Sequence, residues 1–174
     1  FERNVPASEV AAILVEPIQG EGGYIVPPDG FLPGLRALCD EYGILLICDE
    51  VQSGIGRTGK MFACEHWAVE PDIICSTKGL GSGLPIGAVI AKKSLMSQWQ
   101  RGAHGNTYGG NPITCAAASA TLDLVDAGYR DNAARVGDYF MAELAKLQTE
   151  FPCIGQIRGK GLMIGMELIE NDEA

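Results

Sequence analysis

The chain of 174 residues is 47% hydrophobic and 20% charged, which is typical of a globular protein rather than a disordered one. Its formal net charge of −9, without basic clusters in the sequence, argues against a nucleic-acid-binding surface. No apolar run approaches the roughly 20 residues of a membrane span. The six cysteines show no CxxC pair and no zinc-like spacing, so we expect reduced thiols, no metal site and a cytoplasmic protein.

Three short apolar runs each lead into a charged side chain: residues 10–15 into Glu16, residues 44–48 into Asp49, and residues 73–75, across a Ser-Thr pair, into Lys78. Their length and their β-branched residues predict buried strands. A helix predicted over residues 30–42, ending at Gly43, connects the first two strands. Strand, crossover and strand imply a parallel sheet, whose strands end at a common edge where ligands bind. We therefore expect the two acids and the lysine to face one crevice.

Further along the chain, the pattern predicts these elements in order: a strand over residues 86–91, a helical turn over 94–100, a glycine-rich loop over 102–112, helices over 113–127 and 130–149, and a β-hairpin over 155–168. Two helices have an apolar face: Phe31, Leu35, Leu38 and Cys39 on the first, and Val136, Phe140, Leu144 and Leu147 on the last. The change from alternating strands and helices to two helices and a hairpin predicts a domain boundary near residue 125.

Residues 54–61, GIGRTGKM, fit GxGxxG and nearly fit a nucleotide-binding P-loop. Met61 replaces the hydroxyl residue that would bind Mg²⁺, and residues 50–53 separate the glycines from the preceding strand. We therefore expect a plain surface loop. His66 and His104 have no partner at a nucleophile-activating spacing, and we expect both to be structural.

The residues at the strand ends allow two interpretations. Asp49 and Glu50 could cap a helix or form a salt bridge, and Lys78 could pair with Asp49 in a noncatalytic domain. Alternatively, burial would lower the pKa of Lys78 and provide the neutral amine that carbonyl chemistry needs. A lysine that condenses with an aldehyde and a carboxylate that faces it describe a site for pyridoxal phosphate (PLP). Such a carboxylate about 4 Å from the ring nitrogen is worth roughly 4 kcal/mol at a dielectric constant of about 20.

Four segments carry a family resemblance: EPIQGEGG (16–23), CDEVQSGIGRTGK (48–60), PDIICSTKGLGSGLPIGA (71–88) and GNTYGGNP (105–112). In this order they resemble the class III PLP-dependent aminotransferases, especially the branch that acts on ω-amino acids. The resemblance implies an α/β fold, the fold-type I large domain, with a mostly parallel sheet and helices on both faces. Residues 1–125 would form the second part of this PLP-binding domain. Residues 126–174 would begin an α+β C-terminal small domain.

The resemblance also assigns roles by position. Lys78 would be the Schiff-base lysine and Asp49 the partner of the pyridine nitrogen, and these are the two expected catalytic residues. Four further residues would contact the cofactor or the substrate: Val51 one face of the ring, Gln52 the ring hydroxyl, Thr107 the phosphate of the other subunit of a homodimer, and Glu21 the arginine that controls which substrate carboxylate is accepted. Arg158 is expected to be structural.

The expected reaction transfers an amino group from an ω-amino acid, such as 4-aminobutyrate or ornithine, to a 2-oxo acid such as 2-oxoglutarate. A PLP-dependent epimerase or aminomutase, and a noncatalytic globular fragment, are the alternatives. Members of the family are longer, with an amino-terminal phosphate loop and a carboxyl-terminal substrate arginine that have no counterpart in this sequence. We therefore expect a central and C-terminal fragment that is poorly active alone, with no nucleic-acid or membrane partner.

Overall fold

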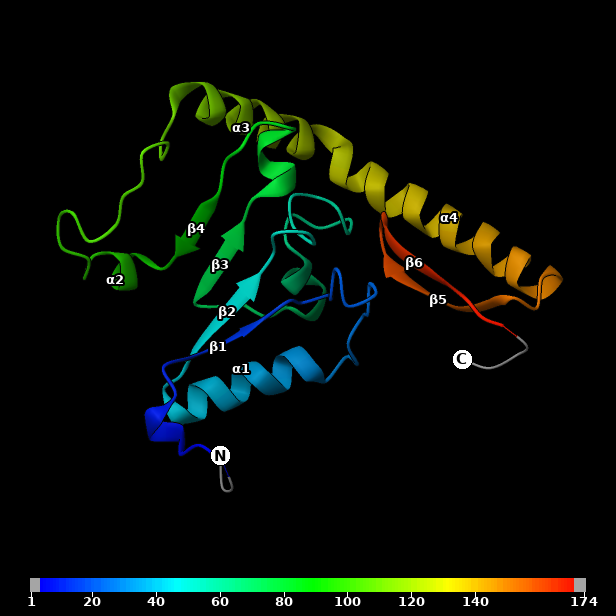
Figure 1. Cartoon of the computed structure of the whole chain (residues 1–174), viewed down its shortest axis with the longest axis horizontal. Helices are drawn as coiled ribbons and strands as arrows, with labels where there is room; N and C mark the ends of the chain where they lie inside the picture. The colour runs from blue at the N-terminus through cyan, green and yellow to red at the C-terminus, as the bar shows by residue number, and fades with distance from the viewer. Residues whose placement is uncertain (1–3, 171–174) are drawn as a thin grey trace.

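The computed structural model describes residues 4–170 and contains a four-stranded sheet in the order β1–β2–β3–β4 (Figure 1). The strands are β1 (Ala12–Val15), β2 (Leu45–Asp49), β3 (Ile73–Ser76) and β4 (Ala88–Ala91). β2 pairs in parallel with both β1 and β3, which confirms the three predicted strands and their direction. The fourth predicted strand also forms. It runs antiparallel to β3, because the chain turns back through the 3₁₀ turn η3 (Lys78–Gly81) instead of crossing the sheet.

Helix α1 (Phe31–Tyr42) connects β1 to β2 and ends at Gly43, whose φ of 68° only glycine adopts easily. The predicted helix is confirmed, but its predicted apolar face is wrong for Phe31. Leu32 and Cys39 are fully buried, whereas Phe31 is 44% exposed. The buried stripe is centred on Leu32 and Cys39, and Phe31 lies on its flank at the first residue of the helix.

The two faces of the sheet have different surroundings. Leu46 and Cys48 point toward α1 and belong to the same core cluster as Leu32 and Cys39. The alternate residues of β2, including Asp49, point to the opposite face. On that face Leu14 is 63% exposed and Val89 is 52% exposed. In the described part of the chain, Asp49 therefore lies on the open face of the sheet.

A partly buried ion pair ties α1 to the sheet. The Arg36 guanidinium lies 2.8 Å from Oδ2 of Asp72, the residue before β3, and this oxygen also accepts the Leu46 N–H at 2.8 Å. Burial of the carboxyl group opposes its ionisation, but the Leu46 N–H and Arg36 outweigh this effect and lower the pKa of Asp72. The contact fixes the helix against two adjacent strands.

Short helices flank the strands of the sheet, and longer helices follow it along the chain. The 3₁₀ helix η2 (Ala63–Trp67) follows β2, α2 (Lys93–Met96) follows β4, and the 3₁₀ helix η1 (Ala7–Glu9) precedes β1. Helix α3 (Pro112–Leu124) then passes through a π-helical turn, η4 (Val125–Tyr129), into α4 (Arg130–Glu150). Within η4, Gly128 has a φ of 133°, and it bends the chain between the two helices (Figure 1). Both predicted helices are therefore confirmed.

The predicted apolar face of α4 is partly wrong. Leu144 is buried as expected, but Phe140 is 48% exposed and Leu147 is 41% exposed. The buried face instead includes two small residues, Ala133 and Gly137. The reason is that a hairpin backbone, rather than large side chains, packs against this helix.

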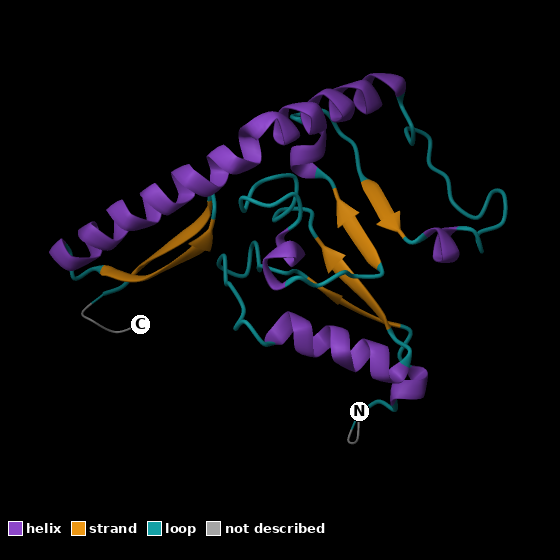
Figure 2. Cartoon of the chain, turned by 180° about the vertical axis from the view of Figure 1, so that it is seen from behind, coloured by secondary structure: helices purple, strands orange, loops and turns teal. Residues whose placement is uncertain are grey.

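The predicted hairpin is confirmed as β5 (Ile154–Lys160) paired antiparallel with β6 (Met163–Leu168), and it lies along α4 (Figure 2). Its turn residue Gly161 meets both α4 and the loop after β2. A Cβ atom on Gly137 would overlap the Gly161 carbonyl, and one on Gly161 would overlap the backbone of Thr58. Leu162 also donates its N–H to the Arg57 carbonyl at 3.0 Å.

These contacts correct the expectation of a surface loop over residues 54–61. Thr58 is 1% exposed, and a Cβ atom on Gly59 would lie 2.8 Å from the Cβ atom of Ala134 in α4. Glycines in this loop permit close packing of α4 and the hairpin. The division into domains at residue 125 stays a prediction, and residue 125 lies in the π-helical turn η4.

Within residues 4–170, no helix combines the length and the apolar character required to cross a bilayer.

We expect Gly137→Ala to lower the free energy of unfolding of the full chain by about 1–3 kcal/mol, the usual cost of overpacking. The added methyl group would overlap the Gly161 carbonyl. This cost should exceed the roughly 1 kcal/mol that alanine gains over glycine in a helix. Urea denaturation followed by circular dichroism measures the change.

The matched control is Gly34→Ala in α1, where an added Cβ atom would meet nothing within 4 Å. Only helix propensity acts there, so stability should rise by about 0.5–1 kcal/mol. If the two substitutions changed stability by the same amount, the close approach of α4 to the hairpin would be wrong.

Candidate functional site

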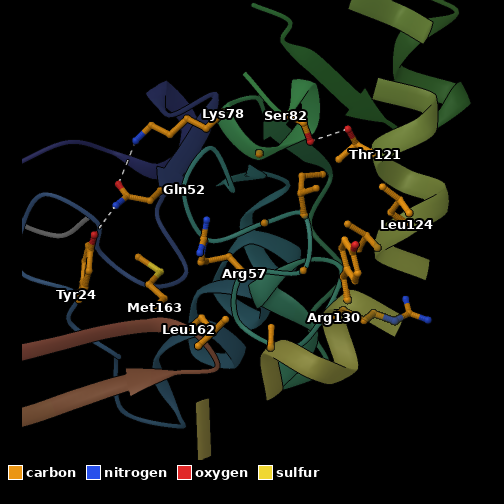
Figure 3. A pocket seen from close by; sticks show the side chains of 17 residues that line it. Tyr24, Gln52, Arg57, Lys78, Ser82, Thr121, Leu124, Arg130, Leu162 and Met163 are labelled. Carbon is orange, nitrogen blue, oxygen red and sulfur yellow. Dashed lines mark hydrogen bonds between the residues drawn. The ribbon is translucent and has the colours of Figure 1, made fainter. Parts of the chain in front are cut away.

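Lys78 lies at the rim of a cavity of about 690 Å³ between the sheet and the start of α4 (Figure 3). Its Nζ atom donates a hydrogen bond to Oε1 of Gln52 at 3.1 Å. The preceding Thr77 donates its hydroxyl to the Ile86 carbonyl at 2.7 Å, which closes the turn between β3 and β4. We expected a buried lysine, but Lys78 is exposed, because β3 delivers it to the open mouth of the cavity.

Asp49 is the last residue of β2 and is half-buried. Its Oδ1 atom accepts the Val51 N–H at 3.0 Å. In the parallel register Asp49 pairs with Cys75, three residues before Lys78, so the predicted placement at one edge of neighbouring strands is confirmed.

The single crevice expected at this edge is divided in the described part of the chain. Lys78 lines the large cavity, whereas Asp49 and Glu16 line a second recess of about 280 Å³. Glu16 also has a local role, because its Oε2 atom accepts the Gly20 N–H at 2.6 Å. It therefore fixes the loop that follows β1.

The fully buried acid of the Asp-Glu pair is Glu50, not Asp49. Glu50 accepts the hydroxyl of Ser53 at 2.5 Å and the N–H of Cys64 at 2.8 Å. It thus holds the turn after β2 against the first turn of η2, in agreement with the helix-capping alternative for this acidic pair. The two-residue period of β2 could have revealed that Glu50 is the buried acid, because it follows Leu46 and Cys48 onto the α1 side.

Gln52 is held between Lys78 and a residue that the sequence analysis did not identify. While its Oε1 atom accepts from Lys78, its Nε2 atom donates to the hydroxyl of Tyr24 at 3.1 Å. Figure 3 shows the three side chains in one row beside the cavity. No spacing in the sequence signals this contact, because Tyr24 and Gln52 come from different loops.

The cavity is also where the backbone is most strained. Within residues 4–170, five non-glycine residues have a positive φ, and four of them line the cavity: Tyr24 (55°), Ile55 (54°), Lys78 (37°) and Ser82 (46°). Left-handed conformations of this kind cost roughly 1–2 kcal/mol each for residues with a Cβ atom. The Ser82 hydroxyl lies 2.9 Å from that of Thr121 in α3, which holds the last of these turns in place. Strain that persists beside a cavity points to a functional geometry.

The remaining candidate residues lie apart from Lys78. Val51 is half-buried and lies two residues after Asp49. Thr107 belongs to the exposed segment 97–110, which extends beyond α2, away from β5 and β6 (Figure 1). Glu21 is exposed and lines a shallow recess with Arg158, whose Nε atom donates to the Gly23 carbonyl at 2.7 Å. Arg158 therefore makes a structural contact, as expected, and the roles of the other three stay predictions.

The sequence and structure match those of known proteins over nearly the whole chain. The model of the family "Aminotransferase class-III" matches residues 2–174. The chain belongs to the class III aminotransferases. It is 51% identical over 169 residues to a putrescine aminotransferase of Pectobacterium atrosepticum, with 94% of this chain and 36% of that protein covered. It is 47% identical over 167 residues to an acetylornithine aminotransferase of Methanopyrus kandleri, with 95% and 42% covered.

Among solved structures, the ornithine aminotransferase of Toxoplasma gondii matches with a TM-score of 0.89 and 42% identity. The match covers 94% of this chain and 39% of that chain, which carries PLP at its active site at partial occupancy. The predicted family and the fold-type I α/β class are therefore confirmed. The chain spans about two-fifths of the length of the relatives it matches.

Neither histidine lies in the row formed by Lys78, Gln52 and Tyr24. Nε2 of His66 lies 3.1 Å from the carbonyl oxygen and 3.2 Å from the hydroxyl of Thr58, in the glycine-rich loop. Burial lowers the pKa of His66, and the positive charge of Lys160 adds to this effect. His66 thus supports the packing of the loop.

We expect the stability of the chain to fall as the pH drops below about 6.5, where a histidine of the unfolded chain becomes protonated. Because the folded chain has the lower pKa at His66, the unfolded chain binds more protons in this range, and unfolding is favoured. In His66→Gln this loss should be absent. Free energies of unfolding from urea titrations at about pH 7.5 and 5.5 measure the difference. If the two proteins lost stability in parallel over this range, the assignment to His66 would be incorrect.

Proposed function

We propose that this chain carries the lysine and the ring-nitrogen carboxylate of a PLP-dependent aminotransferase active site. The main support is the placement of Lys78 and Asp49 at the carboxyl ends of neighbouring parallel strands, where α/β sheets bind ligands. Membership in the class III family supports the same chemistry. The aminotransferase names of the relatives do not favour an epimerase or an aminomutase.

The residues at this edge fit the functional groups of PLP. Lys78 offers a primary amine for the aldehyde carbon, and Asp49 offers a carboxylate for the ring nitrogen. Val51 follows Asp49 and offers an apolar side chain for one face of the ring, and Gln52 offers an amide for the ring hydroxyl. The amine, the carboxylate and the amide thus lie within one edge of the sheet.

When bound, PLP provides an electron sink for the pair of electrons left when the Cα–H bond of the substrate breaks. Lys78 would hold the aldehyde carbon through its Nζ atom, and as a free amine the same atom would accept the Cα proton of the substrate and later donate it back. Gln52 orients this amine through the hydrogen bond to Oε1. Asp49 would provide the negative charge that keeps a proton on the ring nitrogen, which would favour loss of the Cα proton.

The names of the relatives support an amino donor with a terminal amine. We therefore propose an ω-amino acid such as 4-aminobutyrate or ornithine as donor and a 2-oxo acid such as 2-oxoglutarate as acceptor. Glu21 would pair with an arginine and so control which substrate carboxylate is accepted, and its exposure leaves its side chain free to form this pair.

Assembly and location follow the family pattern in this proposal. Thr107 would reach the phosphate of the partner subunit of a homodimer, and the exposure of segment 97–110 leaves it free to do so. Residues 1–125 would belong to the large domain and residues 126–174 to the small domain. The six cysteines are free thiols, as the reducing cytoplasm would keep them.

We expect the full chain, incubated with PLP and reduced with borohydride, to carry the pyridoxyl group on Lys78. Peptide mass mapping locates the adduct. Lys78→Ala should lose it, whereas Lys92→Ala should keep it, because Lys92 lies on the surface in an ion pair with Glu70. Modification at several surface lysines with none at Lys78 would refute the proposed function.

If the chain catalyses transamination, Asp49→Asn should keep the pyridoxyl adduct at Lys78 but slow transamination about 100- to 1,000-fold. The reason is the loss of a charge worth roughly 4 kcal/mol when it lies about 4 Å from the ring nitrogen. Single-turnover kinetics with the amino donor measure the rate. A variant with the rate of the wild type would show that Asp49 does not face the ring nitrogen.

A further inference from the structure

The hydroxyl of Tyr24 is the outermost member of the row that ends at Lys78. We propose that Tyr24 is a positioning residue, which fixes the Gln52 amide with its oxygen toward the Lys78 amine. The inference rests on the proposed function, in which Lys78 binds the cofactor. Tyr24 would act on Lys78 only through Gln52.

Hydrogen-bond chemistry determines which way the amide faces. An ammonium group has donors only, so Gln52 must turn its Oε1 atom toward Lys78. The Nε2 atom then points the other way and requires an acceptor, which the Tyr24 hydroxyl provides at 3.1 Å. Phenylalanine at this position would keep the ring but leave the amide without an acceptor.

The backbone next to Gln52 leaves the amide little freedom to move. A Cβ atom on Gly20 would overlap Oε1 of Gln52, so the Gly20 backbone lies directly against the amide. The Gly20 N–H is fixed by Glu16, and the Gly20 carbonyl accepts the N–H of Tyr24 at 3.1 Å. One short loop therefore forms both the wall behind the amide and the acceptor beside it.

The ring of Tyr24 is itself held in place. It packs against a small core cluster that contains Ile18 and Met163, the first residue of β6. With a φ of 55°, the Tyr24 backbone adopts the left-handed conformation that turns the side chain toward Gln52. The strain at this residue is thus part of the placement of its hydroxyl.

The β5–β6 hairpin packs against the same loop and holds Gly23 and Tyr24 in place. Nε of Arg158 in β5 donates to the Gly23 carbonyl at 2.7 Å, and Glu167 of β6 lies 3.6 Å from the Arg158 guanidinium. A Cβ atom on Gly165 would lie 3.3 Å from both the Gly23 carbonyl and the Tyr24 Cβ atom, so β6 runs close against this loop. The position of Tyr24, and through it that of Gln52, depends on the hairpin.

The test measures the reactivity of the Lys78 amine without any cofactor. The full chain is labelled with a limiting amount of acetic anhydride, and acetylation of Lys78 is compared with that of Lys92 in the same molecules by mass spectrometry. Tyr24→Phe should raise the relative acetylation of Lys78 about two- to tenfold, the effect of weakening one hydrogen bond. Tyr139→Phe, which alters an exposed tyrosine of α4, should leave the ratio unchanged.

A double-mutant cycle separates positioning from a general loss of structure. Gln52→Ala should raise the acetylation of Lys78 at least as much as Tyr24→Phe, and adding Tyr24→Phe to Gln52→Ala should change nothing further. Thermal denaturation followed by circular dichroism shows whether each variant is folded. Gln52→Ala keeps the proposal testable even if Tyr24→Phe does not fold. If Lys78 were acetylated to the same extent in Gln52→Ala as in the wild type, the proposal would be overturned.

Equal acetylation of Lys78 in folded Tyr24→Phe and in the wild type would also overturn the proposal, as would fully additive effects in the cycle. Failure of the proposed function would give a different result. In that case borohydride reduction would place no pyridoxyl group on Lys78. The ratio of Lys78 to Lys92 acetylation would still rise in Tyr24→Phe and in Gln52→Ala.

Discussion

The parallel pairing of β2 with β3 is the constraint on which the candidate site depends. Asp49 pairs with Cys75 of β3, and Lys78 follows Cys75 by three residues, at the start of η3. Neither side chain could be moved to another edge without breaking the ladder, since strand register also decides which face each residue occupies. The chemistry of the site is therefore built on backbone hydrogen bonds rather than on contacts between the two side chains.

A second constraint is the close approach of backbones around residues 54–61. Large side chains usually hold helices against sheets, but here a loop, a helix and a hairpin turn meet at glycines. Gly59 meets α4, and Gly161 meets Thr58 and Gly137. This packing joins the two halves of the chain and places β6 beside the loop that contains Tyr24.

Much of the fold could be predicted from the sequence, because strands and helices carry periodic apolar patterns. The strand ends at Asp49 and Lys78 were found in this way. The patterns were less informative where packing is not made by large side chains. Phe140 looked like a core residue only because the sequence does not show that a hairpin backbone covers α4 at Gly137.

The contacts of the candidate site were harder to predict than its location. Tyr24 meets Gln52 through a left-handed turn, and no sequence period describes such a turn. The roles of Glu50 and Asp49 differ because successive residues of a strand point to opposite faces, so only one acid enters the core. The glycines of residues 54–61 matched a ligand-binding pattern, although in the structure they serve packing.

The open face of the sheet affects how strongly the Asp49 carboxylate can interact with a nearby charge. Asp49 shares that face with Leu14 and Val89, two apolar side chains that are largely in contact with water. A charge about 4 Å away would feel roughly 1 kcal/mol in bulk water but about 4 kcal/mol at the dielectric constant typical of a protein surface. Any polypeptide that comes to rest on Leu14 and Val89 would exclude solvent from Asp49 as well. If Asp49 faces the ring nitrogen as proposed, binding of a polypeptide to this face and protonation of that nitrogen would be thermodynamically linked.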